Sequence, residues 1–189
     1  MNIVIIHYRR VITVIETIKK AGVNMRGAVI LCVLILGSLF SSIAGCSQEN
    51  DENITTIRTF LANEFTGPNE ELTDILDKGP YPPELQVYLE HNYKDFVKDL
   101  GLMFNNGHVL TFLRLAYING YQLSPISIDV KKIETTLNNT YDYKVEVEYS
   151  KNEKTETAIV IGIINLDDDG DILLIRKLED HGLLEQLRH

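Results

Sequence analysis

The sequence is poor in basic residues. Its 189 residues include 18 lysines and arginines against 27 aspartates and glutamates, a formal net charge of −9. Residues 1–45 hold five of the basic groups and one acidic group, so residues 46–189 keep 13 basic (18 minus 5) and 26 acidic groups (27 minus 1), a charge of −13. Because phosphate binding needs a clustered basic face, this balance argues against nucleic acid as a partner.

Cysteine is scarce as well. Cys32 lies inside an apolar N-terminal run and Cys46 lies at its end, so no pair is left for a disulfide within the folded part. The sequence also lacks a Gly-rich phosphate loop, a Cys/His metal cluster and a nucleophile elbow. We therefore expect no cofactor, and we expect a domain of about 140 residues that depends on its hydrophobic core alone.

The N-terminal region has the layout of a secretory signal. Arg26 precedes an uncharged apolar run over residues 27–40, and Ile43, Ala44, Gly45 and Cys46 follow. This last motif resembles the lipobox of bacterial lipoproteins. The resemblance implies cleavage before Cys46 and attachment of two acyl chains, which suffice for stable membrane residence. We therefore expect a lipid-anchored protein of the cell membrane that faces outside the cytoplasm.

Two features of this region leave alternatives open. Residues 27–48 carry no charge and are long enough for an uncleaved membrane span, which would give the same topology. Residues 1–24 do not fit a signal, and we interpret them as an over-extended gene start before Met25; an amphipathic helix over residues 11–20 is the alternative. The expected divisions are thus 1–24, the signal peptide 25–45, the lipidated cysteine and tether 46–53, and one domain over 54–189.

The first half of that domain has helical periodicity. Ile54, Ile57, Leu61 and Phe65 recur at spacings of three and four, which indicates one face of a helix. Prolines, glycines and apolar spacing predict further helices over residues 68–78, 85–96 and 108–119.

The second half changes to a period of two. Tyr143, Val145, Val147 and Tyr149 alternate with charged residues, which is typical of a strand with one buried and one wet face. A phase slip at Lys131-Lys132 predicts a bulge in a strand over residues 126–137. Residues 155–166 are apolar on both faces, which favours a central strand, and an Asp-Gly loop leads to a fourth strand over residues 172–178. A short helix is expected over residues 183–187.

This order predicts an α+β fold, with N-terminal helices packed on a bent four-stranded antiparallel meander. The segment 57–72, which reads IRTFLANEFTGPNEEL, and the strand pattern of residues 143–178 resemble the nuclear-transport-factor-two-like family, and in particular a set of lipoproteins of Gram-positive bacteria. That resemblance implies a cone-shaped roll with a cavity, and no defined activity. A cystatin-like sheet wrapped on one helix is the alternative fold.

The candidate ligand residues are tyrosines and aspartates. Tyr88, Tyr117, Tyr143 and Tyr149 are candidates to line the cavity, although ordinary packing is the favoured interpretation. Asn165, Asp167, Asp169 and Asp171 imitate the start of a calcium loop, but Arg176 stands where a bidentate glutamate belongs. A plain acidic hairpin is therefore favoured over a metal site.

Two hypotheses on function remain. The first is a non-catalytic module that binds a small molecule or a protein partner in the cell envelope. The second is a small isomerase-, cyclase- or hydrolase-like enzyme that uses the cone. No Asp or Glu stands on an apolar strand face, and each histidine is expected to be structural or exposed, so no acid–base pair is predicted and the first hypothesis is preferred.

Overall fold

The computed structural model describes residues 51–134 and 139–189, which belong to one compact unit, Glu49–His189. The expected signal peptide, the lipobox and Cys46 lie outside the described residues. In the part of the chain that is described, no helix is both long enough and apolar enough to cross a membrane.

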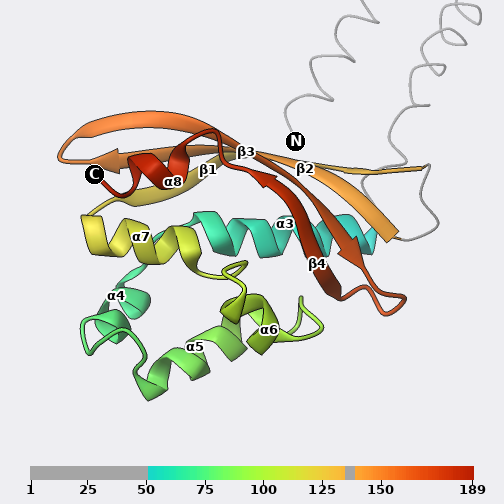
Figure 1. Ribbon diagram of the computed structural model, residues 1–189, viewed down its shortest axis with the longest axis horizontal. Helices are drawn as coiled ribbons and strands as arrows, with labels where there is room; N and C mark the ends of the chain where they lie inside the picture. Colours follow the sequence, from blue (N-terminus) through green and yellow to red (C-terminus); the bar gives the residue numbers. More distant parts are fainter. Residues whose placement is uncertain (1–50, 135–138) are drawn as a thin grey trace, which may run out of the picture. The chain divides into compact units, whose positions relative to one another are not determined.

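Among the described residues, five helices precede a sheet. They are α3 (Glu52–Phe65), α4 (Glu70–Leu76), α5 (Pro83–Tyr93), α6 (Leu100–Asn105) and α7 (Thr111–Asn119). The strands β1 (Gln122–Lys132), β2 (Asn139–Lys151), β3 (Lys154–Leu166) and β4 (Ile172–Glu179) pair antiparallel in the order β1-β2-β3-β4, and α8 (Leu183–Gln186) follows. In Figure 1, α3 and α7 lie directly against the sheet, and α4, α5 and α6 lie beyond them on the same side. This confirms the predicted α+β fold.

Short polar side chains begin three of the helices. The carboxylate of Asp51 accepts a hydrogen bond from the Asn53 amide at 3.0 Å and so caps α3, as its position predicts. Asn69 caps α4 through the Leu72 amide at 2.8 Å, and Asp99 caps α6 through the Leu102 amide at 2.8 Å. Helix α6 was not predicted from the sequence, because only Met103 of its six residues is buried and no apolar spacing marks a buried face.

The bulge in β1 lies at a different place from the one predicted. The register shifts between Pro125 and Ser127, and the pairing is regular through Lys131 and Lys132. Proline has no amide hydrogen for the ladder, so the slip falls beside it and leaves Ile126 unpaired and 53% exposed. The strand also ends at Lys132, and Ile133 and Glu134 already lie outside it.

Two helix boundaries also differ from the prediction. Helix α5 ends at Tyr93 and not at Phe96, because residues 96–98 pair with β4: the Ile172 amide donates to the Phe96 carbonyl at 2.8 Å, and the Lys98 amide donates to the Ile172 carbonyl at 3.0 Å. Helix α7 begins at Thr111 and not at His108, because Leu110 takes a left-handed backbone conformation.

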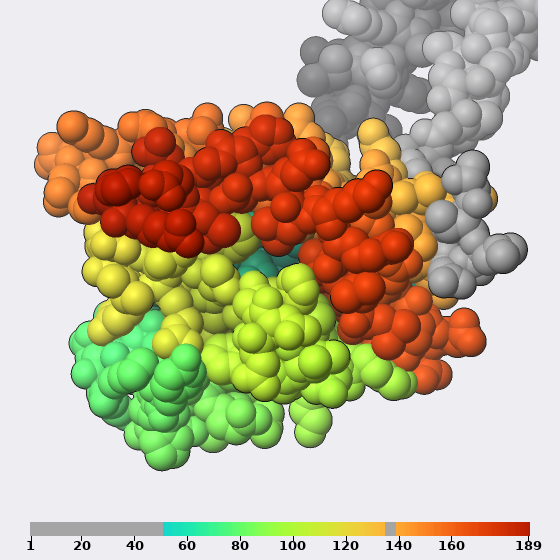
Figure 2. Space-filling view, in the orientation of Figure 1, coloured from blue at the N-terminus to red at the C-terminus, as the bar shows by residue number. Residues whose placement is uncertain are grey.

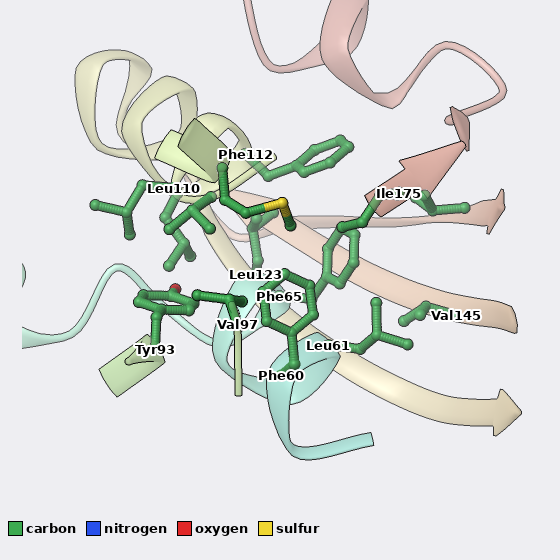
Figure 3. Close-up of a cluster of buried hydrophobic side chains, with 14 of the residues drawn as sticks. Phe60, Leu61, Phe65, Tyr93, Val97, Leu110, Phe112, Leu123, Val145 and Ile175 are labelled. Carbon is green, nitrogen blue, oxygen red and sulfur yellow. The ribbon is translucent and has the colours of Figure 1, made fainter. Parts of the chain in front are cut away.

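The core lies between the helices and one face of the sheet, which we call the inner face. Helix α3 contributes Phe60, Leu61 and Phe65, and Phe65 packs against Phe112 of α7 with ring centroids 4.8 Å apart and ring planes tilted by 46°. Figure 3 shows these side chains meeting Val145 of β2 and Ile175 of β4. Further inner-face residues come from each strand: Leu123, Val130, Tyr141, Tyr143, Val147, Tyr149, Val160, Ile164, Leu166 and Ile172.

Candidate functional site

A carboxylate is buried inside the helical layer. Glu64 of α3 is 4% exposed, and its two oxygens accept the amide hydrogen of Leu110 at 2.9 and 3.1 Å. Burial raises the pKa of Glu64 from its usual 4.5 to about 7, while the Leu110 amide and then the Tyr93 hydroxyl act in the lowering direction. A nearly neutral pKa makes this carboxyl the strongest acid–base candidate in the described part of the chain.

Tyrosines surround this carboxylate. Burial raises the pKa of Tyr88 to about 12, with the charges of Glu71 and Glu64 adding to the effect. Burial followed by the charge of Glu64 raises the pKa of Tyr93, and the same two causes raise that of Tyr143. The Tyr93 hydroxyl also donates to the Asn63 carbonyl at 3.2 Å. Glu64 therefore lies among phenols from α5 and β2 that stay protonated at neutral pH.

Glu64 also has a clear structural role. Leu110 has φ of 64° and ψ of 3°, a left-handed conformation that side chains other than glycine rarely adopt. Its amide hydrogen bond to Glu64 holds this turn, from which α7 starts. Glu64 was not predicted from the sequence, although its spacing marks it: it stands seven residues after Ile57 and three after Leu61, on the apolar stripe of α3.

The four candidate tyrosines fall into separate places. Tyr88 and Tyr143 are buried near Glu64. Tyr117 of α7 donates from its hydroxyl to Asp77 at 2.5 Å, beside a small hollow lined by Leu76 and Ile118. Tyr149 donates to Glu156 at 2.8 Å at the far end of β2. Two of the four therefore lie close enough to Glu64 for its charge to act on them.

The acidic loop is brought together around a lysine. The Lys98 ammonium lies 2.9 Å from Asp167, 3.2 Å from Asp169 and 3.8 Å from Asp171. Hydrogen bonds to Asp167 and Asp169 are the main reason that the pKa of Lys98 is raised. Lys98 therefore supplies the positive charge that a calcium ion would supply in a metal loop. Within residues 51–134 and 139–189, no group of three His, Cys, Asp or Glu side chains is placed to hold a metal.

The sheet face opposite the helices, which we call the outer face, carries a hollow. Ile161 and Ile163 of β3 form its floor, and the volume is about 480 Å³. Three lysines and three acidic residues stand around the floor: Lys131, Lys144, Lys177, Asp129, Asp142 and Glu179. Helices α3 to α7 all lie on the inner side (Figure 1), so none of them covers this hollow.

The outer face differs in charge from the rest of the domain. The six ionic residues of the hollow sum to zero, whereas residues 46–189 carry −13. None of Asp129, Lys131, Asp142 and Lys144 forms an ion pair within 4.0 Å in the described part of the chain. The hollow thus combines an apolar floor with surrounding charges that cancel. Such a surface is better suited to binding another surface than the acidic remainder of the domain is.

No model of a protein family matches the chain, and no curated protein sequence does. The solution NMR structure described as the transfer protein TraH from the Gram-positive conjugative plasmid pIP501 is similar, with a TM-score of 0.48 and 9% identity over 71% of this chain and 97% of that one. A similarity of this size supports no argument about function.

Proposed function

We propose that the protein is a non-catalytic binding module, anchored outside the cytoplasm by lipid on Cys46, and that it binds its partner on the outer face of the sheet. The observation that carries the binding surface is the hollow over Ile161 and Ile163, an apolar floor that helices α3 to α7 leave uncovered. Ile161 and Ile163 are partly exposed, and isoleucine in such positions gains free energy when a partner removes it from water.

The anchor is supported by the sequence. Arg26, the apolar run and the motif Ile43-Ala44-Gly45-Cys46 occur in the order that lipoprotein maturation requires. Cells grown with a labelled fatty acid should incorporate label into the wild type and not into Cys46→Ala, which should keep its N-terminal segment. Cys32→Ala is the matched control and should be labelled normally. Label in Cys46→Ala would contradict the anchor.

The binding surface is tested by native mass spectrometry of the protein extracted gently from its own membrane. We expect an adduct, either a bound molecule or a bound chain, on the wild type. Ile161→Asp should remove it, because a carboxylate on the floor would lose its hydration on binding. Thr157→Asp places the same charge on the same face of β3, away from the hollow, and should keep the adduct. An adduct that survives Ile161→Asp, or a wild type without one, would refute this surface.

One observation favours a second candidate, an enzyme of the cone type that the likeness to the nuclear-transport-factor-two-like family suggests. Figure 2 shows a recess between β4, α8 and the α6–α7 region, through which part of α3, the helix that carries Glu64, is visible. A carboxyl with a pKa of about 7 close to tyrosines could serve as an acid or base. A small-molecule adduct lost in Glu64→Gln and retained in Ile161→Asp would favour this candidate over the outer face.

A further inference from the structure

The strand register arranges the outer face in two rows. One row runs across the sheet through Asp129, Lys144, Ile161 and Glu179, because each of these residues is the cross-strand partner of the next. We call it the first row. The second row runs parallel to it through Lys131, Asp142, Ile163 and Arg176. On each of the first three strands the two rows are two residues apart, and on β4, which has a bulge here, they are three residues apart.

The two rows are opposite in charge on β1, β2 and β4. On β1 an aspartate stands beside a lysine, on β2 a lysine beside an aspartate, and on β4 a glutamate beside an arginine. On β3 both positions are isoleucine. The six charged residues are all exposed, and the two isoleucines are partly buried. Exchanging the first row with the second therefore reverses the sign of every charge and leaves isoleucine on β3. Each row is thus complementary in charge to the other.

We propose that the outer face binds a second copy of this chain, through a two-fold axis that lies between the two rows and runs across the strands. This rests on the proposed function, whose binding surface it fills. A two-fold axis in this direction places the first row against the partner's second row, strand by strand. Asp129 then faces the partner's Lys131, Lys144 faces the partner's Asp142, and Glu179 faces the partner's Arg176. Ile161 meets the partner's Ile163 at the centre.

The charges also select this axis over the other one in the plane of the sheet. A two-fold axis parallel to the strands would keep each row against itself and reverse the strand order, so that Asp129 would face the partner's Glu179. Like charges placed opposite one another at an interface are unfavourable and serve to exclude a wrong arrangement. An interface between two copies related by a two-fold axis uses the same surface on both, so that surface must be complementary to itself. The opposite charges of the two rows meet this requirement.

Two general features favour a second copy as the occupant. Copies of an acidic domain repel each other least where they meet at a neutral patch, and the hollow is such a patch. Sheets that pack face to face lie roughly 10 Å apart, a spacing that isoleucines fill from both sides and that charged side chains at the margin can bridge. Anchorage on one membrane would also raise the effective concentration of the copies.

The test is an exchange of charges in the full-length chain. The swapped chain carries Asp129→Lys, Lys131→Asp, Asp142→Lys and Lys144→Asp, which keeps the net charge and both cross-strand pairs of opposite sign. Two tagged forms are co-expressed and captured from gently solubilised membranes. We expect the wild type to capture the wild type and the swapped chain to capture the swapped chain. Mixed capture should be at least about tenfold weaker, because like charges then meet on β1 and β2.

Three outcomes would overturn the inference. If the wild type does not capture itself, no second copy binds; an adduct of another kind that disappears in Ile161→Asp would show that the proposed function nevertheless holds. If mixed capture equals self-capture, the copies associate through another surface. If the swapped chain melts like the wild type and fails to capture itself, the axis is wrong. Should the swapped chain not fold, the pair Arg176→Glu and Glu179→Arg on β4 serves as the same test, because both residues pair across strands with isoleucines and no like charges are brought together within one chain.

Discussion

Strand β3 shows how differently the two faces of one sheet are used. Its residues at even positions, such as Val160 and Ile164, are completely buried against the helices. Its residues at odd positions, Ile159, Ile161 and Ile163, are of the same chemical type, yet Ile159 is 39% exposed and the other two are only partly buried. The two faces therefore differ in what isoleucine does: on the inner face it stabilises the fold, whereas on the outer face it stays in contact with water, as the proposed function requires.

The largest loss of stability is expected from a substitution on the inner face. Ile164→Ala removes most of a side chain that is fully buried in the core, and should lower the free energy of unfolding by about 2–5 kcal/mol, because transfer free energy is lost and a cavity remains. Urea unfolding followed by circular dichroism measures this. A loss below about 1 kcal/mol would mean that the helices do not pack on this face as described.

The helical layer that covers the inner face contains Glu64, whose contribution to stability should depend on pH. The pKa of Glu64 is about 7 in the folded protein and close to 4.5 when unfolded, so the native state binds the proton more tightly. The stability that comes from this tighter proton binding is therefore fully present below about pH 4.5 and is lost as pH rises through 7. The loss amounts to about 3 kcal/mol of unfolding free energy. Glu64→Gln keeps an acceptor for Leu110 and should lack this dependence.

The measurement is the difference in unfolding free energy between Glu64→Gln and the wild type at pH 5 and at pH 8. Taking the difference cancels the titration of the other carboxylates. Between pH 5 and pH 8 the unfolding free energy of the variant should rise relative to that of the wild type. A difference that is constant with pH would show that Glu64 titrates normally, and would weaken the enzyme candidate too.

A smaller loss of stability is expected at Gly162 of β3, which has no side chain on the inner face. Gly162 lies directly opposite Tyr143 on the inner face, and a Cβ at Gly162 would lie 2.6 Å from the Tyr143 hydroxyl oxygen. Gly162→Ala should therefore displace a buried ring and cost about 1–3 kcal/mol. Adding Tyr143→Phe removes the nearest atom and should recover part of the loss. Full stability of Gly162→Ala, measured by thermal unfolding, would contradict this ring position.

The sequence predicted the inner face better than the outer one. Apolar spacing located α3 and the alternation of Tyr143, Val145 and Val147 located β2, because burial imposes a period on the sequence. The same logic missed Glu64, a charged residue on an apolar stripe. It also placed the bulge at Lys131, since a phase slip in composition does not reveal where Pro125 interrupts the ladder.

The outer face could not be predicted in the same way. The pairing of Asp129 with Lys144 and of Lys131 with Asp142 depends on the register between strands, which only the structure supplies. In the sequence, these residues are four exposed charges on two separate segments. The isoleucines of β3 indicated a central strand correctly, but that indication did not say that helices α3 to α7 would all lie on one of its two faces.

The smallest effect on stability is expected from Ile161→Ala, the outer-face counterpart of Ile164→Ala. Its side chain lies on the floor of an open hollow, so truncation leaves no closed cavity and should cost less than about 1 kcal/mol at protein concentrations where the chain is monomeric. The same substitution should weaken self-capture in membranes, because it removes the contact with the partner's Ile163. Equal losses of stability at Ile161 and Ile164 would show that the outer face is covered within a single chain, and the distinction between the two faces would no longer hold.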